Sequence, residues 1–332
     1  MRAVAKVVMI AVAVTGTTAV GVSRNRTHLN PMIELHAQKK PIFGLYAPSN
    51  PRGRGNRGGN VTAAIIPAPP PPVLKTPAQL AADALAYDKS DFVFDGTMER
   101  GVDGGIPAFS ALVDAMAAAS TPEARWRHPL SVKTPEIAPD PAKAVDNISR
   151  QLNLGVSTIV FVGVESADEV KTGLAAMRFK AKGGTRSDDV GNAPKYWGLS
   201  EKEYRQKADV WPLNPQGELT NWTIVESRKG LEHVREIAAV KGISVLFPGA
   251  GTLRGVFSTT DADGKRTFDA EGWEAAIQKV LAACKEFNVQ CGYPATENDI
   301  EMRMKQGFSV FIMNWGDAGF RAIDLGRQAA AR

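Results

Sequence analysis

The stretch Asn221–Gly255, NWTIVESRKGLEHVREIAAVKGISVLFPGAGTLRG, decides the fold. It reads as an apolar strand, a helix, a second apolar strand and a glycine-rich turn. The first strand ends at a carboxylate, Glu226. The second ends in the turn 249–252, GAGT, where a partner acid would be expected and none is found. Strand–helix–strand units of this kind build parallel sheets.

The same alternation runs through most of the 332 residues. Each of eight short apolar runs is followed by a helical segment; the runs are 41–46, 91–95, 128–134, 157–163, 221–226, 243–249, 289–294 and 308–314. They are continuously apolar, as strands covered on both faces are. The pattern predicts a single (β/α)8 TIM barrel over 30–330. An open doubly wound sheet is the alternative, although no GxGxxG follows the first strand.

Three segments interrupt the alternation. Residues 47–75 are rich in glycine and arginine and then in proline, which predicts an inserted loop. We expect a solvated connection there, with binding of an anionic partner as the alternative. Residues 180–220 form a long polar stretch. Residues 260–269, TDADGKRTFD, begin like a calcium loop but lack its full spacing and closing Glu, so we expect a surface hairpin.

The first 26 residues have a basic start, an apolar run from Val7 and small residues after it. This layout is typical of a secretory signal, and the run is short for a membrane span. We therefore expect an exported protein, periplasmic or secreted, with no stable membrane anchor after cleavage. An uncleaved anchor is the alternative.

Charge and cysteine content constrain the partners further. The net charge of +5 comes partly from the first 26 residues and from the insert, and the remainder is near balance, so we expect no nucleic-acid partner. Cys284 lies in a predicted helix and Cys291 in a predicted strand. A disulfide is permitted in an exported protein, but spacing does not establish its geometry. We favour two buried free thiols.

In a barrel of this type, residues at and just beyond the C-terminal strand ends form the site. Glu226 is the sharpest candidate, because a lone carboxylate facing a glycine-rich turn suits a hard cation. The alternative is a structural acid paired with Arg228 or Lys133. The N–H groups of the turn 249–252 can cradle a carboxylate or an enolate oxygen; the alternative is a plain βα turn.

The four histidines lie at 28, 36, 128 and 233, and none is expected at this end of the barrel. A neutral imidazole base is therefore not expected. Ser-His-Asp and Cys-His catalysis and histidine-rich zinc sites are not expected for the same reason.

Three segments carry a resemblance to a known family: VGVESADEVKTGLAAMRF (162–179), WTIVESRKGLEHVREIAAVKGISVLFPGAGTL (222–253) and GFSVFIMNWGDAGF (307–320). With these, the chain resembles the HpcH/HpaI aldolase and citrate lyase family from about residue 30 to 325, outside the insert. The resemblance implies a barrel of the phosphoenolpyruvate/pyruvate-domain type, often oligomeric through exchange of the last helix. It also implies divalent-metal-dependent, reversible aldol cleavage through a pyruvate-like enolate.

The family's functional positions match unevenly. Glu226 matches the metal-binding glutamate, whereas the second metal carboxylate falls on Thr252, a poorer ligand for Mg²⁺ or Mn²⁺. The arginine that holds the keto acid falls on Lys133, which keeps the charge and loses the bidentate fork. The histidine base falls in DGTMERG, at Arg100 or Met98.

We therefore expect a carbon–carbon lyase of altered chemistry, cleaving a hydroxy carbonyl substrate. Lys133, Arg100 and Glu99 are the expected catalytic residues, and Glu226 and Thr252 the expected ligands of Mg²⁺ or Mn²⁺. The small-molecule substrate is expected to contact Gly249, Ala250, Gly251, Thr252, Arg254 and Trp315. The resemblance predicts a homo-oligomer. The alternatives are a non-catalytic barrel that binds a small ligand and a CoA-ester lyase of the citryl type.

Overall fold

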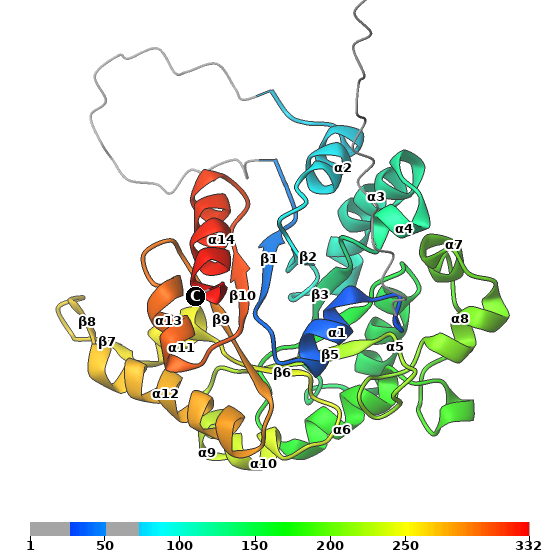
Figure 1. The fold of residues 1–332 in the computed structure, drawn as a ribbon. Coiled ribbons are helices and arrows are strands. Elements are labelled where there is room, and N and C mark those ends of the chain that lie inside the picture. Colours follow the sequence, from blue (N-terminus) through cyan, green and yellow to red (C-terminus); the bar gives the residue numbers. More distant parts are fainter. Residues whose placement is uncertain (1–26, 51–72, 332) are drawn as a thin grey trace, which may run out of the picture.

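The computed structural model describes residues 27–50 and 73–331. Eight strands, all parallel to their neighbours, close into one barrel in chain order, which confirms the predicted (β/α)8 fold (Figure 1). The strands are β1 (Ile42–Tyr46), β2 (Phe92–Asp95), β3 (Leu130–Thr134), β4 (Thr158–Phe161), β5 (Thr220–Val225), β6 (Val245–Pro248), β9 (Gln290–Pro294) and β10 (Val310–Met313). Each lies within two residues of its predicted start.

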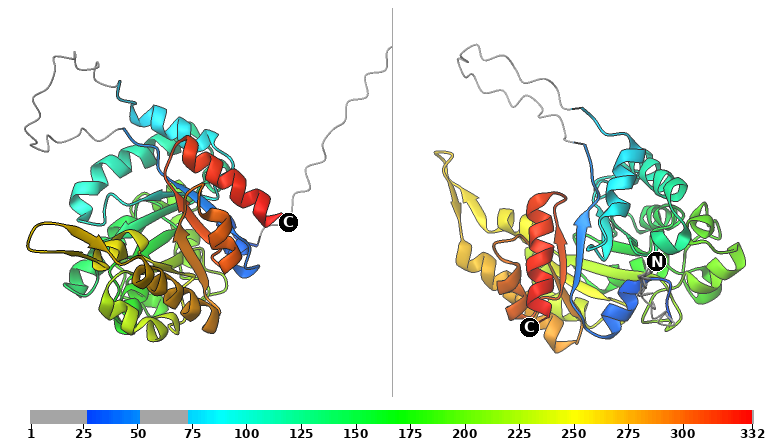
Figure 2. Two further views of the ribbon diagram at one scale, coloured as in Figure 1. Left: turned by 90° about the vertical axis from the view of Figure 1, so that its left-hand side faces the viewer. Right: turned by 45° about the horizontal axis from the view of Figure 1, so that its top comes forward.

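Helices cover the outside of the barrel, as Figure 2 shows from two further directions. They are α2 (Pro77–Ala86), α3 (Val102–Ala119), α5 (Pro141–Leu152), α6 (Ala167–Ala176), α9 (Arg228–Glu232), α10 (Val234–Ala238), α12 (Ala270–Glu286), α13 (Ile300–Gln306) and α14 (Asp317–Ala330). Side-chain caps fix several starts: Thr76, Asp140 and Asp269 each accept a hydrogen bond from an N–H of the first turn. The starts of these helices are therefore determined by residues next to them in the sequence.

Aromatic side chains opposite glycines fill the barrel interior. A Cβ on Gly44 of β1 would lie 2.2 Å from the Phe92 ring, and one on Gly292 of β9 would lie 2.1 Å from the Phe247 ring. The two rings occupy the space that the glycines leave. Phe92 also packs edge-on against the fully buried Trp222, with ring centroids 4.8 Å apart. The interior is thus a packed core rather than a pore.

A short helix, α1 (Pro31–Ala37), lies at the N-terminal end of the barrel, which we call the base. Met32 is fully buried and belongs to the interior cluster. His36 stacks on Trp211 at 6.0 Å between centroids, and its Nδ1 lies 2.6 Å from Gln290 Oε1. The base is closed by apolar and aromatic packing.

Several local expectations need correction. The polar stretch 180–220 is not a plain interruption, since it contains the 3₁₀ helix Lys180–Lys182, α7 (Ala193–Trp197) and α8 (Glu201–Lys207). Capping by Ser200 and the buried Tyr196 and Trp197 explain why these short helices form. The helix expected between the strands at 221–226 and 243–249 is divided into α9 and α10 at His233. The hairpin near 260–269 is confirmed as β7 (Ser258–Thr260) and β8 (Arg266–Phe268).

The expectation of two free thiols is wrong. Cys284 near the end of α12 and Cys291 in β9 form a disulfide, with their Cα atoms 5.6 Å apart. The chain reverses between them, because α12 ends at Glu286 and β9 begins at Gln290. A separation of seven residues thereby becomes a spatial contact within the range that a disulfide needs.

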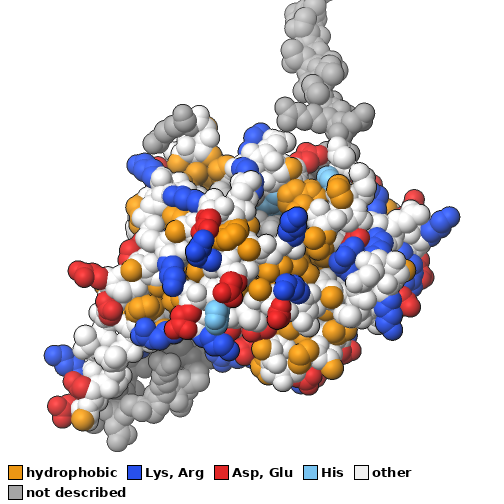
Figure 3. Space-filling view, turned by 90° about the horizontal axis from the view of Figure 1, so that it is seen from below, with side chains coloured by type: hydrophobic (Ala, Val, Ile, Leu, Met, Phe, Trp, Pro, Cys, Tyr) orange, Lys and Arg blue, Asp and Glu red, His pale blue; other side chains and the backbone are white. Residues whose placement is uncertain are grey.

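The predicted signal, 1–26, lies outside the described residues, as does most of the insert. The described ends of the insert meet beside β1, where Asn50 and Lys75 exchange two hydrogen bonds of 2.9 and 2.7 Å. Among the described helices, α3 alone is long and apolar enough to cross a membrane by length and composition. It packs against α2 and buries Phe109, Val113 and Met116. On the face viewed in Figure 3, basic and acidic side chains are interspersed.

Candidate functional site

The C-terminal strand ends form a mouth with a small central cavity of about 210 Å³. Its floor is the top of the interior cluster, namely Phe94, Ile224, Phe247 and Ile312. Lys133, Glu226 and residues 249–252 form its walls. Two wider lobes adjoin it, one of about 720 Å³ beside β1, β2 and β10 and one of about 780 Å³ beside β3. A charged ring thus surrounds an apolar floor.

The wall formed by β2 and β3 carries a cation paired with a carboxylate. Lys133 near the end of β3 places its Nζ 3.1 Å from both carboxylate oxygens of Glu99, which follows β2. The Lys133 side chain is 16% exposed and that of Glu99 34% exposed. The pairing of these two predicted catalytic residues positions the lysine amine at the edge of the cavity.

The wall formed by β5 and β6 carries a carboxylate without a cation. Glu226 is 9% exposed, and its Oε1 accepts a hydrogen bond of 2.9 Å from the N–H of Gly163. Within the described residues no lysine or arginine lies within 4.0 Å of it: Lys133 pairs with Glu99, and Arg228 donates to the Val256 carbonyl. The alternative of a structural ion pair with either residue is therefore wrong.

Gly249 is required for the position of Glu226. A Cβ at Gly249 would lie 2.4 Å from the Glu226 Cβ and 2.6 Å from its Oε2. Beyond Gly249 the chain enters α11 (Ala250–Val256), so the predicted turn is the first turn of a helix. The N–H groups of Ala250, Gly251 and Thr252 have no acceptor within that helix. These groups and Glu226 border the same cavity.

Tyr46, at the end of β1, is a site residue that the sequence reading missed. Its ring packs edge-on against Phe94, 4.8 Å between centroids. A Cβ on Gly96 would lie 3.5 Å from Tyr46 Cε1 and 3.6 Å from Lys133 Cδ, so both side chains pack around this glycine. Burial raises the pKa of the Tyr46 phenol, with opposing influence from Lys133. Tyr46 therefore keeps its proton and can donate a hydrogen bond into the cavity.

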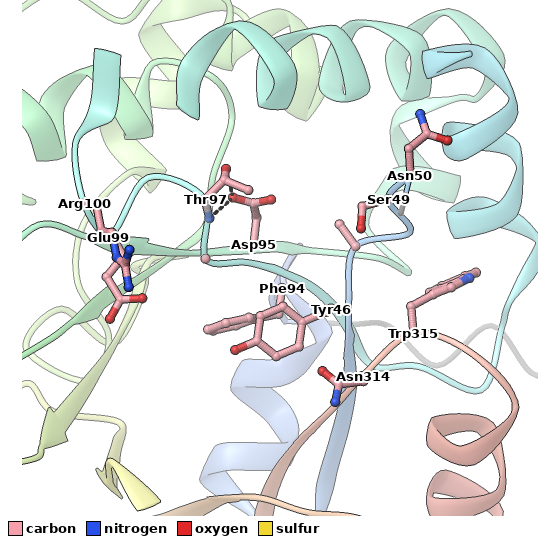
Figure 4. A pocket seen from close by; sticks show the side chains of 12 residues that line it. Tyr46, Ser49, Asn50, Phe94, Asp95, Thr97, Glu99, Arg100, Asn314 and Trp315 are labelled. Atoms are coloured by element: carbon pink, nitrogen blue, oxygen red, sulfur yellow. Dashed lines mark hydrogen bonds between the residues drawn. The ribbon is translucent and has the colours of Figure 1, made fainter. Parts of the chain in front are cut away.

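The lobe beside β1 is shown in Figure 4. Tyr46 and Phe94 lie at its centre, with the Tyr46 hydroxyl directed toward the side of Glu99 and Arg100. Trp315 and Asn314 lie on the other side, after β10. Trp315 packs on Phe320, 5.2 Å between ring centroids. The predicted substrate contact at Trp315 is thus in the mouth, although it is not in the central cavity.

The two predicted arginines have different surroundings. Arg100 is exposed and borders both lobes. Arg254 instead lies over the Phe268 ring, 4.0 Å from its centroid, and it borders none of the three cavities described above. Position 254 therefore packs against the β7–β8 hairpin rather than joining the other site residues.

The second missed residue is Glu136, just beyond β3. A Cβ on Gly163 would lie 2.7 Å from Glu136 Oε1, so this carboxylate approaches the same glycine that donates to Glu226. Its place three residues after Lys133, at the end of a predicted strand, was the available signal. Glu136 is exposed and lines the lobe beside β3.

The described side chains at the cavity offer few ligands for a divalent cation. In residues 27–50 and 73–331, no three acidic, histidine or cysteine side chains lie close enough together to hold a metal ion. At the cavity, Glu226 offers one carboxylate, Thr252 offers a hydroxyl, and Glu99 is engaged by Lys133. Mg²⁺ and Mn²⁺ are hard cations with about six oxygen ligands. The described side chains do not fit a site that holds such an ion by protein ligands alone.

The closed parallel barrel defines a (β/α)8 protein whose candidate site is the charged mouth at the C-terminal strand ends. A profile of the HpcH/HpaI aldolase/citrate lyase family matches residues 107–320. The match covers more than half of the sequence, and the chain belongs to this family.

Individual relatives agree with this assignment. The chain is 23% identical over 301 residues to a hydroxypyruvate/pyruvate aldolase of Paraburkholderia phytofirmans. The aligned region covers 90% of this chain and 92% of the relative. An HpcH/HpaI aldolase/citrate lyase family protein from Burkholderia cenocepacia has a TM-score of 0.60 at 20% identity, covering 91% of this chain and 98% of that one. An HpcH/HpaI aldolase from Desulfitobacterium hafniense has a TM-score of 0.58 at 15% identity, covering 90% and 95%. The solved structures establish the shared fold.

Proposed function

We propose that this protein is a carbon–carbon lyase that cleaves a β-hydroxy carbonyl compound by a retro-aldol reaction. The observation that carries the proposal is the convergence of Lys133 and Glu226 on one small cavity with an apolar floor. Membership of an aldolase and citrate lyase family supports lyase chemistry. Aldehyde-lyase activity is the specific form that the geometry favours.

Retro-aldol cleavage makes two demands on a site. A base must take the proton of the β-hydroxyl group, and a positive group or hydrogen-bond donors must stabilise the electron pair that moves toward the carbonyl. The Glu226 carboxylate is the base in this proposal, because no lysine or arginine of the described residues forms an ion pair with it. Lys133 and the N–H groups at 250–252 serve the carbonyl end. The apolar floor lowers the local dielectric and strengthens these interactions.

The substrate class follows from the size and lining of the mouth. A 2-keto acid fragment fits the central cavity, and the lobe lined by Tyr46, Asn314 and Trp315 accommodates the aldehyde-derived part. The relative from Paraburkholderia phytofirmans is named as acting on hydroxypyruvate and pyruvate. These two keto acids are therefore the first donors to test in the condensation direction, with a panel of aldehydes as acceptors.

The family resemblance also predicts a divalent cation, Mg²⁺ or Mn²⁺, at Glu226 and Thr252. Because the described donor set offers one available carboxylate, no step proposed here passes through a cation. Metal dependence is a separate prediction that is checked by turnover before and after exhaustive chelation.

Cleavage and condensation by wild type and Glu226→Gln test the proposed function. The variant keeps the shape of the side chain and loses the base, so we expect turnover to fall by about 10²–10⁴-fold. Lys171→Arg is the matched control, because Lys171 forms an ion pair with Asp168 on α6, outside the mouth. Equal turnover in wild type and Glu226→Gln would contradict the proposal, and ligand stabilisation without turnover would favour a binding-only barrel.

Localisation and assembly are also proposals. Export follows from the layout of residues 1–26, and the Cys284–Cys291 disulfide is compatible with an oxidising compartment. Homo-oligomer formation follows from the family resemblance. In the single chain, α14 packs beside α13 and Arg327 donates to the Lys89 carbonyl. Light scattering of the purified protein tests the oligomer.

A further inference from the structure

The lysine at the mouth lies where the family resemblance places an arginine. An arginine and a lysine supply the same charge, but a lysine also supplies a primary amine that can attack a carbonyl carbon. We propose that Lys133 forms a Schiff base with the keto group of the substrate, so that the carbonyl is activated by a covalent iminium ion. This inference rests on the proposed lyase function and names how the carbonyl is activated.

The position of Lys133 suits a nucleophile. Its side chain is 16% exposed, and it borders both the central cavity and the lobe beside β3. Its stem packs near Gly96 and Tyr46, as the Cβ test at Gly96 shows. The stem is therefore supported while the amine remains beside the space where a carbonyl carbon would lie.

Glu99 supplies the proton acceptor that imine formation needs. Both of its oxygens lie 3.1 Å from Lys133 Nζ, within reach for direct proton transfer. Tyr46 lies on the same side of the cavity and carries a protonated hydroxyl. A nucleophile, a carboxylate and a phenol thus meet at the ends of three adjacent strands, β1, β2 and β3.

The donor set supports the same conclusion from the opposite wall. Glu226 is one carboxylate, and its partner position is occupied by the hydroxyl of Thr252. An iminium carries its positive charge on the nitrogen atom, which is bonded to the former carbonyl carbon of the substrate. It stabilises the developing electron pair without a second carboxylate at position 252.

The reaction balances without an oxidant or a reductant. The Lys133 ammonium first passes a proton to Glu99, and the free amine adds to the carbonyl carbon. One nitrogen proton and the proton held by Glu99 then go to the former carbonyl oxygen, which leaves as water and gives the iminium. Glu226 takes the β-hydroxyl proton, the Cα–Cβ bond breaks, and its electron pair moves to the iminium nitrogen as the aldehyde departs. The resulting enamine is protonated on carbon, and one water hydrolyses the iminium to free Lys133 and the keto acid.

The rival role for Lys133 is a charge that holds the substrate carboxylate. Lys133→Arg separates the two roles, because arginine keeps the charge and restores the residue that the resemblance implies. With a Schiff base we expect kcat/KM to fall by about 10³-fold in Lys133→Arg. Retained or improved turnover in this variant would overturn the inference. Lys171→Arg again serves as the control.

Borohydride trapping tests the covalent bond itself. The full-length protein is incubated with pyruvate, reduced with sodium borohydride and analysed by intact and peptide mass. We expect a mass gain of one pyruvate less one oxygen atom on the peptide that contains Lys133, and none in Lys133→Arg. An adduct on another lysine, such as Lys143 in the adjacent lobe, would overturn the inference.

The outcomes separate the inference from the proposed function. Wild type that turns over without forming the adduct overturns the Schiff base and leaves the lyase function standing. An adduct on Lys133 without cleavage or condensation supports the Schiff base and contradicts the lyase. Wild type that shows neither adduct nor turnover overturns both.

Discussion

The two ends of the barrel differ in the burial and the pairing of their polar side chains. At the base, α1 buries Met32 fully, and His36 lies between aromatic rings with Gln290 as its partner. At the mouth, Lys133 and Glu99 are partly exposed, and no lysine or arginine in 27–50 and 73–331 forms an ion pair with Glu226. Burial at the base supplies stability, whereas charged groups beside an apolar floor supply reactivity. Variants at the base should therefore change stability, and variants at the mouth should change turnover.

The largest expected effect is in the barrel interior next to the base, where the Trp222 ring lies 6.5 Å from that of His36. Trp222→Ala removes a fully buried ring that packs on Phe92 and Phe247, with centroids 4.8 and 5.6 Å away. We expect the free energy of unfolding to fall by about 3–5 kcal/mol, measured by urea denaturation. Trp222→Phe should cost less, because much of the ring volume is kept. A change below about 1 kcal/mol for the alanine variant would contradict the packed-base account.

The second largest effect is a loss of stability at low pH, which arises from His36 at the N-terminal end of the barrel. Burial lowers the pKa of His36 to about 4, although its hydrogen bond to Gln290 opposes the shift. An unfolded histidine titrates near 6.5, so between about pH 6.5 and pH 4 the unfolded chain binds a proton that the folded chain does not. This contribution is complete above pH 6.5 and falls by on the order of 3 kcal/mol as the pH drops through that window. Comparing unfolding at pH 7 and pH 4.5 for wild type and His36→Gln isolates it; equal pH dependence in both would count against it.

At the mouth, Gly249→Ala should displace Glu226, since the added Cβ would lie 2.6 Å from its Oε2. A shift of this size is expected to lower kcat/KM by about 10²-fold. Gly255→Ala, on the helix α11 that follows Gly249, is the control, because its Cβ would meet no atom of the described structure within 4 Å. Equal activity in the two variants would show that the position of Glu226 does not matter.

The smallest effect concerns the cation. Thr252→Asp restores the second carboxylate that the family resemblance implies, beside Glu226. We expect Mn²⁺ to bind about tenfold more tightly than in wild type, measured by calorimetry. Equally tight binding by wild type and variant would mean that the wild-type donor set already suffices for a cation, contrary to the fit described above.

Most of the fold could be predicted from the sequence, because continuous apolar runs and helix caps are local signals. The eight strands lie where the patterns placed them. The disulfide was not legible, since it depends on how the chain reverses between α12 and β9. The short helices within 180–220 were missed because their apolar residues, such as Tyr196 and Trp197, are buried by tertiary packing rather than by periodicity.

The sequence predicted most residues of the candidate site, but it did not predict which of them contact one another. Lys133, Glu99, Glu226 and the turn 249–252 were identified, and the structure brings them to one mouth. Their partners follow from register and side-chain direction across separate βα units. For that reason the Lys133–Glu99 pair was not foreseen, and the role of Tyr46 emerges only from its packing beside Gly96.

A crystal structure of the full-length protein after incubation with pyruvate and borohydride tests the Schiff base at Lys133 most directly. We expect continuous density from Lys133 Nζ to the second carbon of the keto acid, with Glu226 facing the bound fragment. Unmodified Lys133 still paired with Glu99, and pyruvate bound through a cation on Glu226, would contradict it.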